Sequence, residues 1–414
     1  MKFQKYNIAE SIKKSLAELG FNRPTDIQYK AIHHIMQGED VLAIAQTGTG
    51  KTAAFVIPML DKIERNKYQK EKGAAPTCVV MVPTHELAIQ IHKVFLEIGK
   101  YCGAIATAIY GGVEQDAQIA RLKKGTDILI ATPGRLFDLQ AQGHLDLKKV
   151  ETLILDEADH MLKLGFLQDI RDLLGRLPNK RQTLFFSATI DEEIKELAYS
   201  IVHKPIRIQI SPKDPVNKNI DHGVAFIEQD EKRFFLERLI KENKDQKFLV
   251  FVRTKVRSER VYAAMARVDI VAITIHGDKD QKERTQVLED FSSGKILVMI
   301  ATDVSARGID ISDVDFVINY DLPDVAENYV HRVGRTGRGN KRGKAVAFCC
   351  EEEKPLLAAI EEYMGKEVKV LSYDKEDREI TLDLSKEKKF TLNDVMKEIA
   401  AAEAEKKNRR KKKK

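Results

Sequence analysis

Short apolar runs alternate with helical patterns along this chain, and this alternation constrains the fold more than any other feature of the sequence. The runs are rich in β-branched residues and are too short for helices. In the first half they lie at 41–45, 78–82, 104–110, 128–131, 152–155 and 183–186. Strands of this kind, separated by helices, form a parallel sheet that is covered on both faces. We therefore expect an α/β domain over residues 1–210.

A second series of the same kind follows. Its runs lie at 248–252, 271–275, 296–300, 316–320 and 345–349. Residues 211–219 contain two prolines and no apolar periodicity, so they are expected to be a linker. The pattern weakens after about residue 370, where only a short amphipathic helix is expected, at 393–405. The predicted organisation is a second α/β domain at 220–370 and a C-terminal extension at 371–414.

The segment from Ala45 to Thr52, AQTGTGKT, follows the first apolar run and is typical of a phosphate-binding loop. Its backbone N–H groups can turn toward phosphate oxygens, and the loop positions are Thr47, Gly48, Thr49 and Gly50. Lys51 is expected to meet the β and γ phosphates, and the Thr52 hydroxyl to ligate Mg²⁺. Ala45 stands where the pattern usually has glycine. An ordinary glycine turn is the alternative, but the position between a strand and a helix favours nucleotide binding.

Adjacent carboxylates, Asp156 and Glu157, come directly after the apolar run at 152–155. Alone they could be a solvated acidic turn, but the phosphate loop upstream favours a catalytic site at the carboxyl edge of the sheet. Asp156 is expected to hold Mg²⁺ through water. Glu157 is expected to orient and deprotonate the attacking water, which predicts hydrolysis of the γ phosphate of ATP.

The second half lacks a phosphate loop but contains the basic segment HRVGRTGR, from His331 to Arg338. If the domains face each other, Arg335 and Arg338 can act as arginine fingers, which in phosphoryl transfer contribute ~10³ to 10⁵ in rate. The alternative is an exposed basic loop that contacts solvent or nucleic acid. The arginine-finger interpretation requires the two domains to close for hydrolysis.

Over residues 3–365 these motifs, in this order, resemble those of the DEAD-box ATP-dependent RNA helicases, whose name matches Asp156-Glu157-Ala158-Asp159. The resemblance implies two tandem RecA-like domains with the ATP site in the cleft between them. Because the chain lacks elaborate appendages, it is similar to the short bacterial RhlE-like members. For these, ribosome assembly or RNA turnover is the expected context.

The resemblance also implies roles around the nucleotide. The segment Gly20 to Gln28 is similar to the Q motif, in which Gln28 reads the adenine edge with both amide groups and Phe3 packs near the base; Phe21 belongs to the same site. Asp310 resembles the ribose-contacting aspartate. His331 and Asp303 resemble interdomain contacts. Asp159, Ser187 and Thr189 resemble the residues that couple hydrolysis to unwinding, through hydroxyl bonds to the acidic tetrapeptide.

An RNA-facing set is similar to that of the family. Its members are Pro83, Thr84, Gly111, Gly112, Thr132, Pro133, Gly134, Arg135, Arg253, Thr254, Gln281, Arg284 and Thr302. Backbone amides, hydroxyls and scattered basic groups suit phosphates and 2′-hydroxyls, so binding independent of RNA sequence is expected. His85 departs from the arginine usual in the family, and so does His160, to which the sequence assigns no role.

Composition adds four expectations about the chain as a whole. Its four cysteines have neither paired nor metal-type spacing, which predicts free, buried thiols. No apolar run is long enough to span a membrane, so a cytoplasmic protein without membrane contact is expected. The last nine residues carry eight positive charges, typical of an arm that contacts nucleic acid or of a solubilising tail. Nothing in the sequence demands more than a monomer.

Two other functions compete with a helicase. An ATP-gated RNA clamp uses the same closure with little strand separation. A DNA translocase shares the two-domain ATPase core, but the acidic tetrapeptide and the adenine-reading segment disfavour it.

Overall fold

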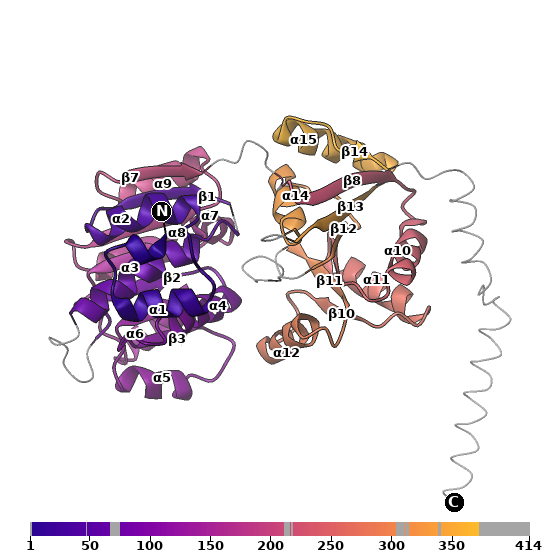
Figure 1. The fold of residues 1–414 in the computed structure, drawn as a ribbon. Helices are drawn as coiled ribbons and strands as arrows, with labels where there is room; N and C mark the ends of the chain where they lie inside the picture. The colour runs from indigo at the N-terminus through magenta and orange to yellow at the C-terminus, as the bar shows by residue number, and fades with distance from the viewer. Residues whose placement is uncertain are drawn as a thin grey trace, which may run out of the picture.

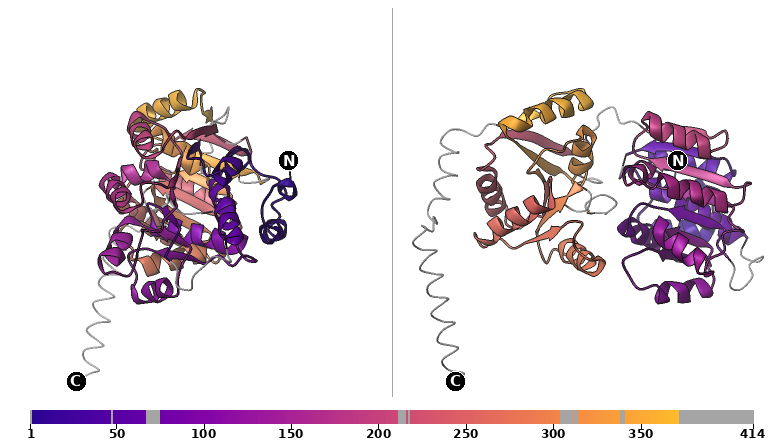
Figure 2. Two further views of the ribbon diagram at one scale, coloured as in Figure 1. Left: turned by 90° about the vertical axis from the view of Figure 1, so that its left-hand side faces the viewer. Right: turned by 180° about the vertical axis from the view of Figure 1, so that it is seen from behind.

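The computed structural model describes residues 2–46, 48–66, 75–210, 216, 218–303, 311, 314–337 and 341–371. Within these ranges the chain forms two seven-stranded sheets in which every paired strand is parallel. Figure 1 shows the sheets in separate halves of the molecule, and Figure 2 shows helices on both faces of each. The expected tandem α/β architecture is therefore confirmed.

The first half contains helices and strands in regular alternation. Its elements are η1 (Phe3–Lys5), α1 (Glu10–Glu18), α2 (Asp26–Met36), β1 (Val41–Ala45), α3 (Lys51–Arg65), β2 (Cys78–Met81), α4 (His85–Ile98), β3 (Ala106–Ile109), α5 (Asp116–Lys123), β4 (Ile128–Ala131), α6 (Pro133–Ala141), β5 (Thr152–Leu155), α7 (Ala158–Lys163), α8 (Leu167–Arg176), β6 (Gln182–Ser187), α9 (Glu192–Ile201) and β7 (Ile206–Ile210).

Strand β1 shows why its run is apolar throughout. Val41, Ala43 and Ala45 belong to the core on one face of the first sheet, whereas Leu42 and Ile44 belong to the core on the other. Successive side chains of a strand point to opposite faces, so a sheet covered twice needs apolar residues at every position. The strand order is β3-β4-β2-β5-β6-β1-β7.

The second half repeats this plan. Its elements are β8 (Ile220–Phe226), α10 (Lys232–Glu242), β9 (Phe248–Val252), α11 (Lys255–Ala266), β10 (Ala272–Ile275), α12 (Gln281–Ser292), β11 (Val298–Thr302), β12 (Phe316–Asn319), α14 (Ala326–Val333), β13 (Gly343–Cys349), η3 (Glu351–Glu353), α15 (Lys354–Met364) and β14 (Lys369–Val370). The order β10-β11-β9-β12-β13-β8-β14 matches that of the first sheet, position for position.

The structure differs from the sequence expectations at the ends of the sheets. The strands β7, β8 and β14 were not expected, because edge and near-edge strands mix polar and apolar residues and lack the continuous apolar run. The chain begins with a 3-10 turn over Phe3–Lys5, which is followed by α1 from Glu10.

The four cysteines are free thiols. Cys78, Cys349 and Cys350 are buried, as expected, whereas Cys102 is partly exposed and its Sγ lies 3.5 Å from the hydroxyl of Ser11. In the ranges given above, no helix combines the length and apolar character needed to cross a membrane. The helix expected at 393–405 and the basic tail lie outside the described residues.

Candidate nucleotide site and nucleic-acid interface

The strand order brings three loops together at the carboxyl edge of the first sheet. Strands β5, β6 and β1 are neighbours in that order. Asp156 follows β5, the Ser187 segment ends β6, and the phosphate loop follows β1. Parallel strands end at the same edge, so residues more than a hundred positions apart in sequence meet there. This edge is where open α/β folds bind nucleotides.

The phosphate loop has the backbone geometry that its glycines allow. Gly48 and Gly50 have φ values of 81° and 93°, in the left-handed region that favours glycine. A Cβ on Gly50 would lie 2.5 Å from Nε2 of Gln28, so this position also requires the absence of a side chain. Thr49 Oγ1 donates to the carbonyl of Gln46 at 2.8 Å and closes the loop. Thr47 lies outside the described residues.

Lys51 begins helix α3 and is only 6% exposed. Among the described residues, none accepts a hydrogen bond from its buried Nζ. A buried ammonium without an acceptor is costly, and the site therefore fits a ligand that supplies anionic oxygens. Its charge acts on Asp156 and Glu157, so the lysine faces the acidic segment.

Asp156 is 3% exposed, and burial raises its pKa to about 7. The charge of Lys51 opposes this rise, while Glu157 and Asp159 reinforce it. A bound cation would stabilise the ionised form of this buried carboxylate. Within the described part of the chain, no three His, Cys, Asp or Glu side chains are grouped to hold a metal. Mg²⁺ at phosphate sites takes one or two carboxylates with phosphate oxygens and water, which Asp156 and Thr52 fit.

Glu157 adopts an uncommon backbone conformation, with φ 53° and ψ 47°, at the start of α7. The buried His160 holds its carboxylate, with Nδ1 3.4 Å from Oε2. A carboxylate only accepts, so Nδ1 is the donor. Burial alone would raise the pKa of Glu157, but this hydrogen bond and the charges of Lys51 and Arg335 hold it below its usual value. The residue therefore stays an ionised carboxylate, as a base requires.

The contact between the acidic segment and β6 uses backbone rather than hydroxyl groups. The N–H of Ala188 donates to Oδ1 of Asp159 at 3.3 Å. Ser187 Oγ instead accepts from the N–H of Thr189, and Thr189 Oγ1 is buried with no partner among the described residues. One hydrogen bond from the backbone N–H of Ala188 to Asp159 therefore stands in place of the expected bonds from the hydroxyls of Ser187 and Thr189.

Gln28 joins the Q segment to the phosphate loop. Its Oε1 accepts from the N–H of Thr25 at 3.0 Å, and its Nε2 donates to the carbonyl of Gly50 at 3.0 Å. Each amide atom keeps one further hydrogen-bonding position for a base. Phe3 is 3% exposed and packs in the core of the first half, and its packing near adenine stays a prediction. Phe21 is 45% exposed.

In the second half, helix α14 is anchored by Arg332, an arginine to which the sequence gave no role. Its guanidinium bonds both carboxylate oxygens of Asp303, at 2.6 and 2.7 Å, and also bonds Asn319 Oδ1 and the carbonyl of Asp321. Asp303 was expected at the domain interface, but its carboxylate is tied inside the second half. Arg332 is 2% exposed.

Arg335 follows α14 and is 6% exposed. It belongs to the second half, yet its charge lowers the pKa of Glu157 in the first. The arrangement therefore brings the two parts of the predicted site together. His331 lies on α14 and is partly exposed. Arg338 and Asp310 lie outside the described residues.

The predicted RNA-facing residues occupy the other part of the carboxyl edges. In the first sheet they follow β2, β4 and β3, which are adjacent. Thr84 and Thr132 are the N-cap residues of α4 and α6, with Pro133, Gly134 and Arg135 in the first turn of α6, and Gly111 and Gly112 follow β3. In the second sheet, Thr254 is the N-cap of α11 and Thr302 ends β11. Helix N-termini with free N–H groups suit phosphates.

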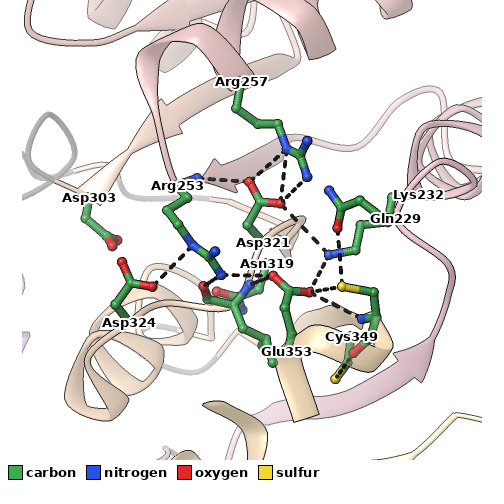
Figure 3. A network of polar contacts seen from close by, with 12 residues as sticks. Gln229, Lys232, Arg253, Arg257, Asp303, Asn319, Asp321, Asp324, Cys349 and Glu353 are labelled. Atoms are coloured by element: carbon green, nitrogen blue, oxygen red, sulfur yellow. Dashed lines mark hydrogen bonds and ion pairs between the residues drawn. The ribbon is translucent and has the colours of Figure 1, made fainter. Parts of the chain in front are cut away.

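Three predicted RNA contacts, Arg253, Gln281 and Arg284, have side chains that contact other side chains. Arg253 contacts Glu353 at 3.2 Å and Asp324 at 3.3 Å, within the polar network of Figure 3. Glu353 is the centre of that network, since it also accepts from Lys232 and from the N–H of Leu322. The roles of these residues in RNA binding stay predictions.

The other two engaged residues bridge the halves. Arg284 Nε donates to Glu86 Oε1 at 2.7 Å, and both side chains are largely buried. Gln281 Oε1 lies 3.2 Å from Nδ1 of His85. His85 therefore lies at the contact between the halves, packed against Tyr110.

Comparison with known proteins assigns this geometry to a family. A model described as the DEAD/DEAH box helicase matches residues 25–197, and one described as the helicase conserved C-terminal domain matches residues 231–340. An ATP-dependent RNA helicase RhlB of Shewanella woodyi is 41% identical over 378 residues, which cover 91% of this chain and 86% of that protein. The chain belongs to the DEAD-box family of ATP-dependent RNA helicases. The expected RhlE-like subgroup stays a prediction, because this relative carries the RhlB name.

Solved DEAD-box helicases share the fold. Yeast Dbp5 bound to RNA and ADP BeF3 is 28% identical, with a TM-score of 0.80 over 93% of this chain and 99% of that one. A Dbp5 variant bound to ADP, Gle1 and other components is 27% identical, with a TM-score of 0.65 over 92% and 100%.

The sequence assigns no role to three residues that the structure places at this site: His160, Lys163 and Arg332. Lys163 and Arg332 contact residues far away in sequence, and the bond between His160 and Glu157 depends on the turn between them, so no local pattern reveals these contacts. Arg332 stands inside the segment from His331 to Arg338, and this position was the signal available for it.

Proposed function

We propose that this DEAD-box helicase hydrolyses ATP at a split site, with Lys51, Thr52, Asp156 and Glu157 on one domain and Arg335 on the other. The observation that carries the proposal is that the helix preceding Arg335 meets the helix of the acidic tetrapeptide, with Lys163 Nζ 3.1 Å from Glu327 Oε2, and the charge of Arg335 accordingly lowers the pKa of Glu157. The domains are proposed to span 1–210 and 220–370, joined by 211–219, with 371–414 as an extension. Closure is then a condition for catalysis.

The chemistry follows from the protein groups. Lys51, whose buried Nζ has no acceptor among the described residues, binds the β and γ phosphates. Mg²⁺ held by Thr52 and Asp156 would neutralise charge on the phosphates. Glu157 accepts the proton of the attacking water, and Arg335 balances charge that develops on the γ phosphate. His331 and Arg338 complete this set by resemblance to the family.

RNA is proposed to lie along the other part of both carboxyl edges, where the N-termini of α4, α6 and α11 point. Contacts there are to phosphates and 2′-hydroxyls, so binding is independent of base sequence. When the domains close around one bent strand, its partner strand is displaced.

We also propose that the protein acts as a monomer in the cytoplasm, in ribosome assembly or RNA turnover.

An ATP-gated clamp is the second candidate, and the helicase relatives do not favour it. Displacement of a short labelled duplex at low RNA occupancy distinguishes the two, since a clamp would bind without separating the strands. ATPase activity with and without RNA is the companion measurement, and an RNA-independent rate would contradict both.

The sharpest test of the site is Glu157→Gln. The amide keeps the shape of the side chain but cannot accept a proton, so turnover should fall by about 10²- to 10⁴-fold while ATP and RNA still bind. Steady-state hydrolysis and fluorescence binding measure the two parts. Glu192→Gln is the matched control, because Glu192 is exposed on α9 and pairs only with Lys195. Turnover by Glu157→Gln at the rate of the unmodified protein would refute Glu157 as the base.

A further inference from the structure

The six-residue helix α7 connects the acidic tetrapeptide to the surface between the two domains. Glu157 precedes its first residue, and His160 within it holds the Glu157 carboxylate. Lys163 is its last residue. A contact made by Lys163 therefore affects the position of α7, the short helix that begins next to Glu157, the proposed base.

Helix α14 is the matching element of the second domain. Glu327 lies in its first turn, and Arg335 follows its end. Between them Arg332 is bonded to Asp303, Asn319 and the carbonyl of Asp321, which fixes the helix to its own domain. Glu327 and Arg335 therefore move together when the domains open or close.

The two helices meet through an ion pair across the interface. Lys163 Nζ lies 3.1 Å from Oε2 of Glu327, with the side chains 36% and 12% exposed. Lys163 lies six positions after Glu157, and Arg335 lies eight positions after Glu327, beyond the end of α14 at Val333. The ion pair is thus a contact point between the two helices, separate from the end of α14, where the charge of Arg335 acts on Glu157.

We propose that the Lys163–Glu327 pair positions the arginine-bearing helix against the helix of the acidic tetrapeptide when the domains close. Two contact points between α7 and α14 fix the rotation of one helix relative to the other, whereas a single contact point does not. Neither residue touches the reacting atoms, so both are positioning residues. The proposal rests on the proposed roles of Arg335 and Glu157, and it adds a residue pair that selects the productive closed geometry.

A charge swap tests the pair. Lys163→Glu and Glu327→Lys each place like charges together and should lower the RNA-stimulated kcat by about three- to tenfold. The double variant restores an attractive pair and should recover most of the rate. RNA affinity without nucleotide should be unchanged in all three variants, because that readout does not need the closed state. Lys100→Glu is the matched control, since Lys100 pairs with Glu18 on the exposed surface of the first domain.

The outcomes separate this inference from the proposed function. If Arg335→Ala is inactive but the double variant is as slow as the single ones, the positioning role is wrong and the split site stands. If Arg335→Ala hydrolyses ATP at the rate of the unmodified protein, the split site itself is wrong. If the single swaps leave kcat unchanged, the pair has no role in closure.

Discussion

At the scale of single residues, the site depends on side chains that control one another. The side chain of Glu157 is only 15% exposed, which favours its neutral form, and the hydrogen bond from His160 and nearby cations reverse this preference and lower its pKa. For Asp156, one residue earlier, burial outweighs the attraction of the Lys51 charge, and the pKa is raised to about 7. Adjacent carboxyl groups thus have different protonation behaviour because their neighbours differ. This division suits a metal ligand beside a base.

His160 is the residue whose role can be tested most directly. His160→Ala removes the donor to Glu157, so the carboxylate loses its orientation and kcat should fall about tenfold, the effect of one charge-assisted hydrogen bond. His160→Asn retains an N–H near the position of Nδ1 and should recover much of the rate. KM for ATP should change little, since His160 has no part in phosphate binding. Equal kcat values for the alanine variant and the unmodified protein would contradict this role.

At the scale of elements, the carboxyl edge of each sheet is divided in two. The order β3-β4-β2-β5-β6-β1-β7 gathers the nucleotide loops after β5, β6 and β1 and leaves the RNA-facing loops after β3, β4 and β2. In the second sheet the corresponding strands β10, β11 and β9 precede the predicted RNA contacts. One topology, used twice, therefore places the predicted RNA contacts of both domains after corresponding strands.

Helix α14 contains two arginines that should respond differently to substitution. Arg332→Ala leaves the Asp303 carboxylate, Asn319 Oδ1 and the carbonyl of Asp321 without their partner and should destabilise the second domain by about 3–5 kcal/mol. Arg335→Ala should abolish hydrolysis with a modest loss of ATP affinity. Thermal unfolding and ATPase assays separate the two effects. Lys241→Ala, which removes an exposed pair with Glu237, is the stability control and should cost less than about 1 kcal/mol. An Arg332 variant of unchanged stability would contradict the anchoring of α14.

At the scale of the molecule, side-chain contacts join the halves at two places. Glu86–Arg284 and His85–Gln281 lie beside the predicted RNA contacts, and Lys163–Glu327 lies beside the proposed nucleotide site. Contacts at both places would make closure respond to both ligands, which is the physical basis of coupling.

The basic tail is a property of the whole chain, because it adds charge without belonging to either domain. Removing residues 406–414 should leave kcat at saturating RNA unchanged and weaken RNA binding. The plot of log affinity against log salt should flatten by roughly 0.7 for each charge that contacts single-stranded RNA. Titrations of a labelled oligonucleotide at several salt concentrations measure the slope. An unchanged slope would identify the segment as a solubilising tail.

Much of the fold was readable from the sequence because both sheets are buried on two faces. The run at 41–45 is apolar at every position for that reason and coincides with β1. Strand β7, Ile206–Ile210, alternates apolar and polar residues at the edge of the sheet and gave no such signal. The site was readable where a motif imposes local geometry, as at Gly50. Pairings such as Arg332 with Asp303 were not, because contact between distant residues leaves no local pattern.

The sequence by itself determined the tandem α/β plan, the phosphate loop, the acidic tetrapeptide and the need for cations from the second domain. These follow from local requirements: buried strands need apolar residues, and tight turns near phosphates need glycine. Only the tertiary structure decided which arginine anchors α14 and which approaches Glu157, and that His160 holds the Glu157 carboxylate. It also decided that Lys163 meets Glu327. Such choices depend on distances between elements, which the order of residues along the chain does not contain.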